Sequence, residues 1–157
     1  PIHATIISGF PGDGCFLWES VHHGHIPSMI PGGKIDGVQA VEIIPRLEHH
    51  VGRIYHYKLQ HKLIASEQGD LWRFLNLQAG KPFDFMGQYR GRIMPFGWLQ
   101  SVFFPWPEHT LRWYCAKLVF AALRATGRIH GDASVQAPGP MFRRFVRWGM
   151  YTRERIQ

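Results

Sequence analysis

The sequence lacks the long apolar runs and the clustered cysteines that define several classes of protein. No apolar stretch approaches the roughly 18 uninterrupted residues that a membrane-spanning helix needs, so we expect no transmembrane segment. The two cysteines, Cys15 and Cys115, lie too far apart in the chain to form a disulfide framework or a thiolate zinc site of their own. The chain also lacks a basic and apolar secretory signal at its start, which makes a cytoplasmic location the default expectation.

Apolar residues and positive charge are what the sequence has in quantity. An apolar share of 45% in 157 residues is enough for one hydrophobic core, so a single domain over residues 1–157 is expected. The formal net charge is +7, but residues 1–84 carry 7 basic and 8 acidic side chains, whereas residues 85–157 carry 11 and 3. The basic second half favours an anionic substrate or surface as a partner.

The order of the expected elements predicts an α+β fold. Residues 1–60 are expected to be β-rich, since short apolar runs alternate there with turns that contain Gly and Pro. Connections this short favour antiparallel neighbours. The four candidate strands cover residues 3–7, 15–21, 37–44 and 51–57.

Helical periodicity follows the candidate strands. One helix is predicted over residues 66–80 with Ser66 as its N-cap, and the clearest helix is predicted over residues 113–127. Residues 82–109, between the two helices, are expected to form an irregular insertion rich in aromatic side chains. A basic helix and tail are expected over residues 138–157.

Cys115 is the first candidate for chemistry, because it lies at or near the start of the clearest helix. A thiol in the first turn meets unpaired N–H groups that favour thiolate and lower its pKa from about 8.5, and these groups can also hold an oxyanion. The alternative is a buried small hydrophobe. A thiol nucleophile needs an imidazole base and a polar group that orients it. His3 and Glu19, on the first two candidate strands, can supply these, although Glu19 can equally face solvent.

Five segments resemble, in this order, the permuted NlpC/P60 family of papain-like thiol hydrolases, and they span roughly residues 2–127. In this group the His precedes the Cys along the chain, as it does here. Lys117 stands where the family usually has Glu and changes the charge near the site, and Phe83 replaces the usual Tyr. The matching segments are His3–Gly9, Leu17–Val21, Gly37–Val41, Gly80–Phe85 and Tyr114–Val119.

The resemblance implies a permuted papain-like fold, in which an antiparallel sheet or small barrel packs against helices. It makes Cys115 the nucleophile at a helix N-terminus, His3 the general base and Glu19 the group that orients the imidazole. The implied activity is hydrolysis of an amide bond, in a peptide, an isopeptide or a cell-wall peptide, through a thioester on Cys115, without a cofactor or metal. The alternative within the same fold, as in the lecithin:retinol acyltransferase relatives, is a hydrolase or acyltransferase that acts on lipid acyl groups.

Clustered histidines raise the possibility of a zinc site. Histidines one or two residues apart can share a zinc ion, but the chain has no HExxH motif, no paired cysteines and no carboxylates at ligand spacing. A native zinc site is therefore not favoured. The histidines concerned are His22, His23, His25, His49 and His50.

The basic C-terminal segment suggests a second alternative, a nucleic-acid-binding or interaction protein without catalysis. Five arginines alternate with aromatic side chains over residues 141–157, and such a pattern can contact phosphates and stack on bases. We favour an amphipathic helix whose arginines are solvated. Its expected inward side chains are Phe142, Phe145, Val146 and Trp148.

Overall fold

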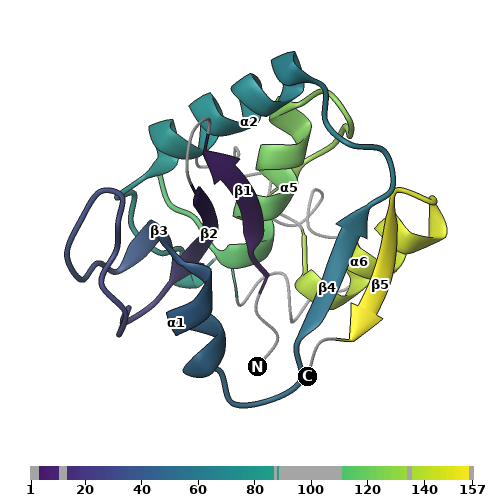
Figure 1. Cartoon of the computed structure of the whole chain (residues 1–157). Coiled ribbons are helices and arrows are strands. Elements are labelled where there is room, and N and C mark those ends of the chain that lie inside the picture. Colours follow the sequence, from purple (N-terminus) through teal and green to yellow (C-terminus); the bar gives the residue numbers. More distant parts are fainter. Residues whose placement is uncertain (1–3, 11–13, 87, 89–110, 134–135, 156–157) are drawn as a thin grey trace.

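The computed structural model describes residues 4–10, 14–86, 88, 111–133 and 136–155 (Figure 1). These residues form helices and two small antiparallel sheets, which confirms the predicted α+β class. No helix among the described residues has the length and apolar character required to cross a membrane.

The larger sheet has three antiparallel strands in the order β1-β2-β3, as expected from the short connections. Trp18 in the central strand pairs with Ile6 on one side and with Ala40 on the other. Trp18 and Ala40 are fully buried, which ties the register of the sheet to the core. The strands are β1 (Ile6–Phe10), β2 (Gly14–Val21) and β3 (Gly37–Glu42).

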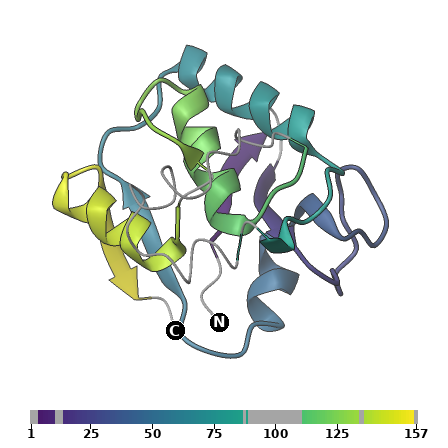
Figure 2. The same cartoon turned by 180° about the vertical axis from the view of Figure 1, so that it is seen from behind.

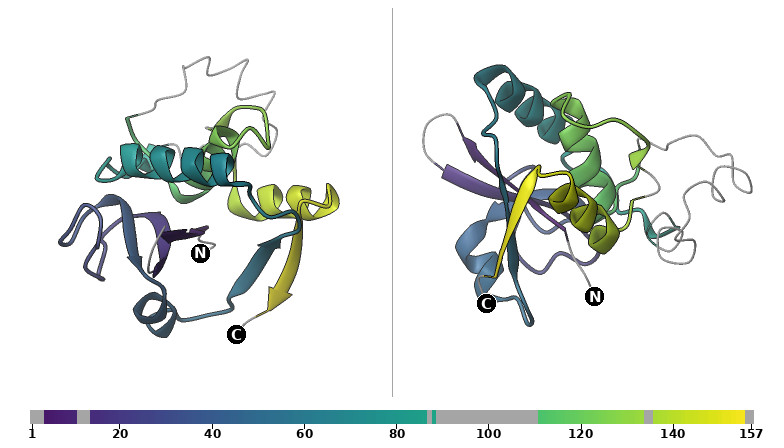
Figure 3. Two further views of the ribbon diagram at one scale, coloured as in Figure 1. Left: turned by 45° about the horizontal axis from the view of Figure 1, so that its top comes forward. Right: turned by 90° about the vertical axis from the view of Figure 1, so that its right-hand side faces the viewer.

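Helices α2 (Ala65–Gln78) and α5 (Cys115–Ala125) cover one face of this sheet, and α1 (Ile43–Glu48) lies on the other side (Figure 3). Every residue of α5 from Cys115 to Leu123 is buried. A helix that is apolar nearly all round belongs in the interior of a fold, and α5 accordingly forms the centre of the hydrophobic core.

The smaller sheet joins two distant parts of the chain. Strand β4 (Tyr55–Leu59) pairs antiparallel with β5 (Tyr151–Arg155), and α6 (Pro138–Arg147) packs beside them (Figure 2). The ring of Tyr57 stacks on Phe142 with centroids 4.3 Å apart. This stacking seats α6 on the two-stranded sheet.

Three of the four candidate strands have other bounds in the structure: the strands run over residues 6–10, 37–42 and 55–59 instead of 3–7, 37–44 and 51–57. The third candidate strand was extended to residue 44, but the chain turns into α1 after Glu42. Pro45 explains the change, because it cannot donate a hydrogen bond to a sheet and fits the first turn of a helix. The fourth candidate strand does not join the first three, since β4 pairs with β5 alone.

The basic helix and tail expected over residues 138–157 consist of α6 followed by strand β5, which was not predicted. Gly149 adopts φ 69°, which ends the helical segment and lets the chain return along β4. Arg143, Arg144 and Arg147 are solvent-exposed, as the amphipathic interpretation requires. Trp148, however, is 57% exposed and was wrongly expected to face inward, as was Val146, which is 38% exposed.

The two main helices are joined by the guanidinium of Arg128. It donates to both carboxylate oxygens of Glu67, at 2.9 and 2.7 Å, and to the carbonyls of His61 and Lys62. Glu67 also accepts a hydrogen bond from the backbone N–H of Ile64, which is the N-cap of α2 in place of the predicted Ser66. The end of α5 is thereby tied to the start of α2.

We expect the Glu67 contribution to stability to depend on pH. Hydrogen bonding from Arg128 and from the Ile64 N–H lowers the pKa of Glu67 below its ordinary 4.5. A carboxylate with a lowered pKa stabilises the fold above its unfolded-state pKa, and this stabilisation is lost as the pH falls through the folded-state value. Glu67→Gln should therefore lower the melting temperature at pH 7, and this difference should shrink below about pH 4.5. Thermal unfolding followed by circular dichroism measures it, with the exposed Glu48→Gln as control; a difference that does not change with pH would contradict the assignment.

Candidate active site

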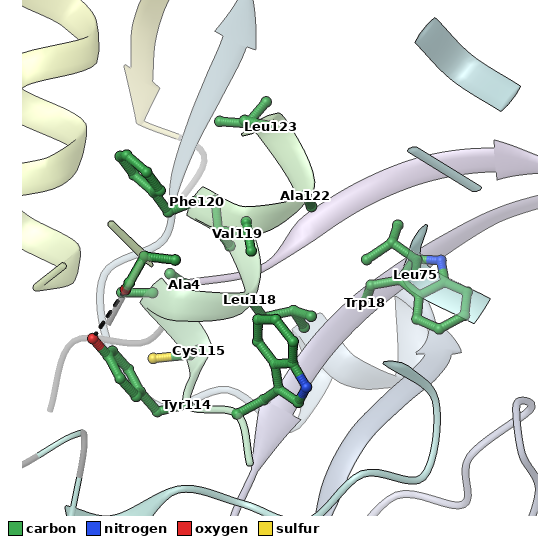
Figure 4. Close-up of a cluster of buried hydrophobic side chains, with 14 of the residues drawn as sticks. Ala4, Trp18, Leu75, Tyr114, Cys115, Leu118, Val119, Phe120, Ala122 and Leu123 are labelled. Carbon is green, nitrogen blue, oxygen red and sulfur yellow. Dashed lines mark hydrogen bonds between the residues drawn. The ribbon is translucent and has the colours of Figure 1, made fainter. Parts of the chain in front are cut away.

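Cys115 is the first residue of α5, which confirms the predicted placement of this thiol at a helix N-terminus. Its side chain is 3% exposed and lies in the buried cluster that includes Ala4, Tyr114 and Leu118 (Figure 4). Tyr114 is the extended N-cap residue and makes no side-chain cap, so no side chain of the N-cap competes for the first N–H groups of α5.

The backbone of Trp113 fixes where α5 begins. Its carbonyl accepts a hydrogen bond from the Ser20 hydroxyl at 2.6 Å and another from the Asp84 N–H at 2.9 Å. Its own N–H donates to the Pro82 carbonyl at 3.0 Å. The last turn of backbone before Cys115 is therefore held by β2 on one side and by residues 82–84 on the other.

Residues 82–84 are in turn held against the start of β3. Val38 donates its N–H to the Lys81 carbonyl at 2.9 Å, and Gly37 forms a bridge with Pro82. A side chain at Gly37 would collide with the Lys81 carbonyl, so only glycine allows the two backbones to approach this closely. The sheet, residues 82–84 and the start of α5 thus form one continuous hydrogen-bonded unit.

A buried cation lies in the first turn of α5. Lys117 is 1% exposed, and its Nζ donates to the Arg112 carbonyl at 2.8 Å and lies 3.7 Å from Oδ2 of Asp84. It also lies over the Trp113 ring, 5.1 Å from the centroid. A cation at this end of a helix opposes the helix dipole, and the Asp84 carboxylate offsets that cost. The positive charge favours an anion at the start of α5.

Glu19 is buried and paired, which settles how this carboxylate is accommodated in an apolar strand. It is 1% exposed, and its two oxygens accept hydrogen bonds from Gln39 Nε2 and Arg46 Nε, both at 2.9 Å. Successive strand residues point to opposite faces, so Glu19 points toward α1 whereas Ser20 points toward Trp113. The sequence left open whether Glu19 faces solvent or a partner, and the structure shows the paired carboxylate.

The third predicted site residue, His3, lies outside the described residues, as do residues 89–110 of the aromatic insertion. The described chain begins at Ala4, which is 2% exposed and belongs to the same buried cluster as Cys115. The segment that follows His3 therefore reaches the core around the thiol.

Tyr114 is a neutral hydrogen-bond donor beside the thiol. Burial, together with the negative charge of Asp84, raises the pKa of its phenol well above the usual 10. The hydroxyl donates to the Ala133 carbonyl at 3.3 Å, as the dashed line in Figure 4 marks. This bond holds the loop after α5 against Tyr114, the residue that precedes α5.

Sequence reasoning did not single out Ser20, Asp84 or Arg46, although each of them holds a part of the site. Ser20 and Asp84 lie in segments that carry the family resemblance, but their partner is a backbone carbonyl distant in sequence. Arg46 lies in α1, where no helix was predicted. No side-chain pattern along the chain marks such partners.

Comparison of the chain with family models, with curated proteins and with solved structures found no match.

Removal of the Ser20 hydroxyl should destabilise the protein. Ser20→Ala leaves the Trp113 carbonyl with one donor, the Asp84 N–H, so we expect a loss of about 1 kcal/mol in the free energy of unfolding. Urea denaturation measures this loss. Ser66→Ala is the matched control, because Ser66 is exposed; equal effects of the two substitutions would show that the hydrogen bond to Trp113 contributes nothing.

The pair of Lys117 and Asp84 should show strong energetic coupling. Lys117→Met and Asp84→Asn each remove one member of this ion pair, whereas the double variant removes both. The two single losses in the free energy of unfolding should therefore add up to about 1–3 kcal/mol more than the loss in the double variant. A double-mutant cycle in urea measures this coupling. The exposed pair of Arg73 and Asp70 in α2 is the control and should show no measurable coupling.

Proposed function

We propose that the protein is a thiol hydrolase of the permuted NlpC/P60 type, which cleaves an amide bond through a thioester on Cys115. The observation that carries the proposal is the position of Cys115 as the first residue of α5, at a helix start held by Ser20 and Asp84. A thiol placed by two independent backbone contacts at a helix N-terminus differs from an ordinary core cysteine, whose position is set by packing alone.

The proposed reaction begins with the thiolate of Cys115. The N–H groups of the first turn favour the ionised thiol. The thiolate attacks the substrate carbonyl, and the carbonyl oxygen takes the negative charge at the same N–H groups. The His3 imidazole accepts the thiol proton and returns it to the leaving amine as the carbon–nitrogen bond breaks. Water then attacks the thioester and releases the acid, which restores the thiol.

Glu19 is the orienting group for the His3 imidazole that the resemblance implies, although its carboxylate points toward α1 whereas α5 covers the other face of the sheet. Its ion pair with Arg46 and its hydrogen bond from Gln39 hold the carboxylate in one position. Papain-like chemistry needs a polar group of this kind because the imidazole must present one nitrogen to the thiol. Under this proposal, Arg46 and Gln39 act through Glu19 as positioning residues.

The same thiol could serve a lipid ester, since acyl transfer to Cys115 does not depend on whether nitrogen or oxygen leaves. The substrate class therefore has to be measured. Activity on peptide amides and on lipid esters, compared between the wild type and Cys115→Ala, separates amide hydrolysis from the lipid alternative.

Alkylation by iodoacetamide tests the nucleophile directly. Cys15 is exposed in β2 and will react as an ordinary thiol, so the test uses Cys15→Ser as the background. In this variant we expect Cys115 to react at pH 7 at least as fast as free cysteine, because a nucleophile must be ionised and reachable. The labelling should disappear when Cys115→Ala is added.

A structural cysteine gives the opposite result. A thiol as buried as Cys115 is inert if it serves only the core, so labelling far slower than that of free cysteine would overturn the proposal. Unfolding in urea should then expose the thiol and restore the ordinary rate, which shows that the thiol was intact.

A further inference from the structure

One loop, residues 22–36, joins β2 to β3 at one end of the three-stranded sheet. Val21, the last residue of β2, pairs with Gly37, the first residue of β3. Because the strands are antiparallel, the two ends of this loop emerge side by side. The loop begins with His22 and His23 and ends with Asp36.

The side chains of His22, His23 and Asp36, from the two ends of this loop, converge. Nδ1 of His22 lies 3.0 Å from both carboxylate oxygens of Asp36, and the rings of His22 and His23 lie 3.6 Å apart between centroids. One ligand atom from each of the three residues lies within 4.8 Å of the others. The described residues contain no other group of three such side chains this close together.

The backbone brings the two ends of the loop closer together than most sequences allow. A Cβ at Gly24 would lie 2.6 Å from the Ile35 carbonyl oxygen, so glycine is needed where the two ends touch. His23 adopts φ 54°, a left-handed conformation that is uncommon for a residue with a side chain. Strained backbone of this kind is concentrated at binding sites. The Phe85 ring packs edge-on against His22 at 4.0 Å and limits where this imidazole can turn.

We propose that His22, His23 and Asp36 form a binding site for Zn²⁺ or another late first-row divalent ion. Two imidazoles and one carboxylate are the donors that such ions take, and three protein ligands leave a position for water or a further ligand. Ligand atoms around a tetrahedral Zn²⁺ lie roughly 3.3 Å apart, given bonds of about 2.0–2.1 Å. The separation between His22 and Asp36 already approaches this value, and rotation of exposed side chains closes the rest.

The proposed set differs from the one that the sequence suggests. The sequence suggests a set of histidines that also includes His25, His49 and His50, and it shows no carboxylate at ligand spacing from them. Folding supplies Asp36 from the other end of the same loop, through the register of β2 and β3. The proposal does not depend on the reaction proposed for Cys115, since none of the three ligands belongs to that site.

Titration of the full chain with Zn²⁺ tests the proposal. Bound metal is first removed with a chelator, and the chelator is then dialysed away. Calorimetry should show one equivalent bound by the wild type, and His22→Ala or Asp36→Ala should weaken binding at least tenfold, about the least that losing a direct ligand costs. His25→Ala and His49→Ala are matched controls from the same group of clustered histidines and should bind as the wild type does.

A third variant separates loss of a ligand from loss of the fold. His23→Gly removes an imidazole and also relieves the left-handed strain, so this variant should melt at the wild-type temperature or above while binding Zn²⁺ at least about tenfold more weakly. Equal binding by all the variants, or no binding by the wild type, overturns the proposal. Titration with Co²⁺ gives one more decisive outcome: an intense near-ultraviolet thiolate band, lost in Cys15→Ser or Cys115→Ser, would show that a cysteine holds the ion.

Discussion

The backbone of Trp113 is the point on which the candidate active site depends. Its carbonyl accepts hydrogen bonds from the Ser20 hydroxyl of β2 and from the Asp84 N–H. Its own N–H donates to the Pro82 carbonyl, which makes a second bond to residues 82–84. Each hydrogen bond contributes only about 1 kcal/mol, but the bond from Ser20 is buried, and leaving its acceptor unpaired would cost more. The start of α5 is therefore held in one position relative to the sheet. Because Cys115 is the first residue of α5, its position is fixed as well. A shift at Trp113 would move the thiol and the first-turn N–H groups together.

Buried charges flank this junction on both sides of the sheet. Lys117 and Asp84 lie toward α5, and Glu19 with Arg46 lies toward α1. Ion pairs of this kind are weak evidence for stability, because removing the charges from water costs nearly as much as their attraction returns. We interpret them as devices that hold geometry: each pair joins an element of the sheet side to a helix or loop that packing alone would hold less specifically.

The sequence predicts those parts whose pattern is local. Cys115 begins a helix because apolar residues follow it at every core position, and the antiparallel strands β1 to β3 follow from short turns. Strand β5 could not be predicted, because its residues alternate no apolar face and gain their structure only by pairing with β4. The same holds for the partners of Glu19 and of His22. Arg46 reaches Glu19 from helix α1, and Asp36 reaches His22 through the register of β2 and β3; both arrangements exist only in the folded chain.

The pairing of β4 with β5 also constrains how the protein is made. Strand β4 consists of residues 55–59, yet its only strand partner among the described residues is formed by residues 151–155. During synthesis the core around α2 can assemble as α5 leaves the ribosome, while the edge of β4 stays unpaired until residues 151–155 have emerged. An unpaired edge invites wrong partners. The exposed Lys58 beside the aromatic side chains of β4 is the kind of charged edge residue that discourages them.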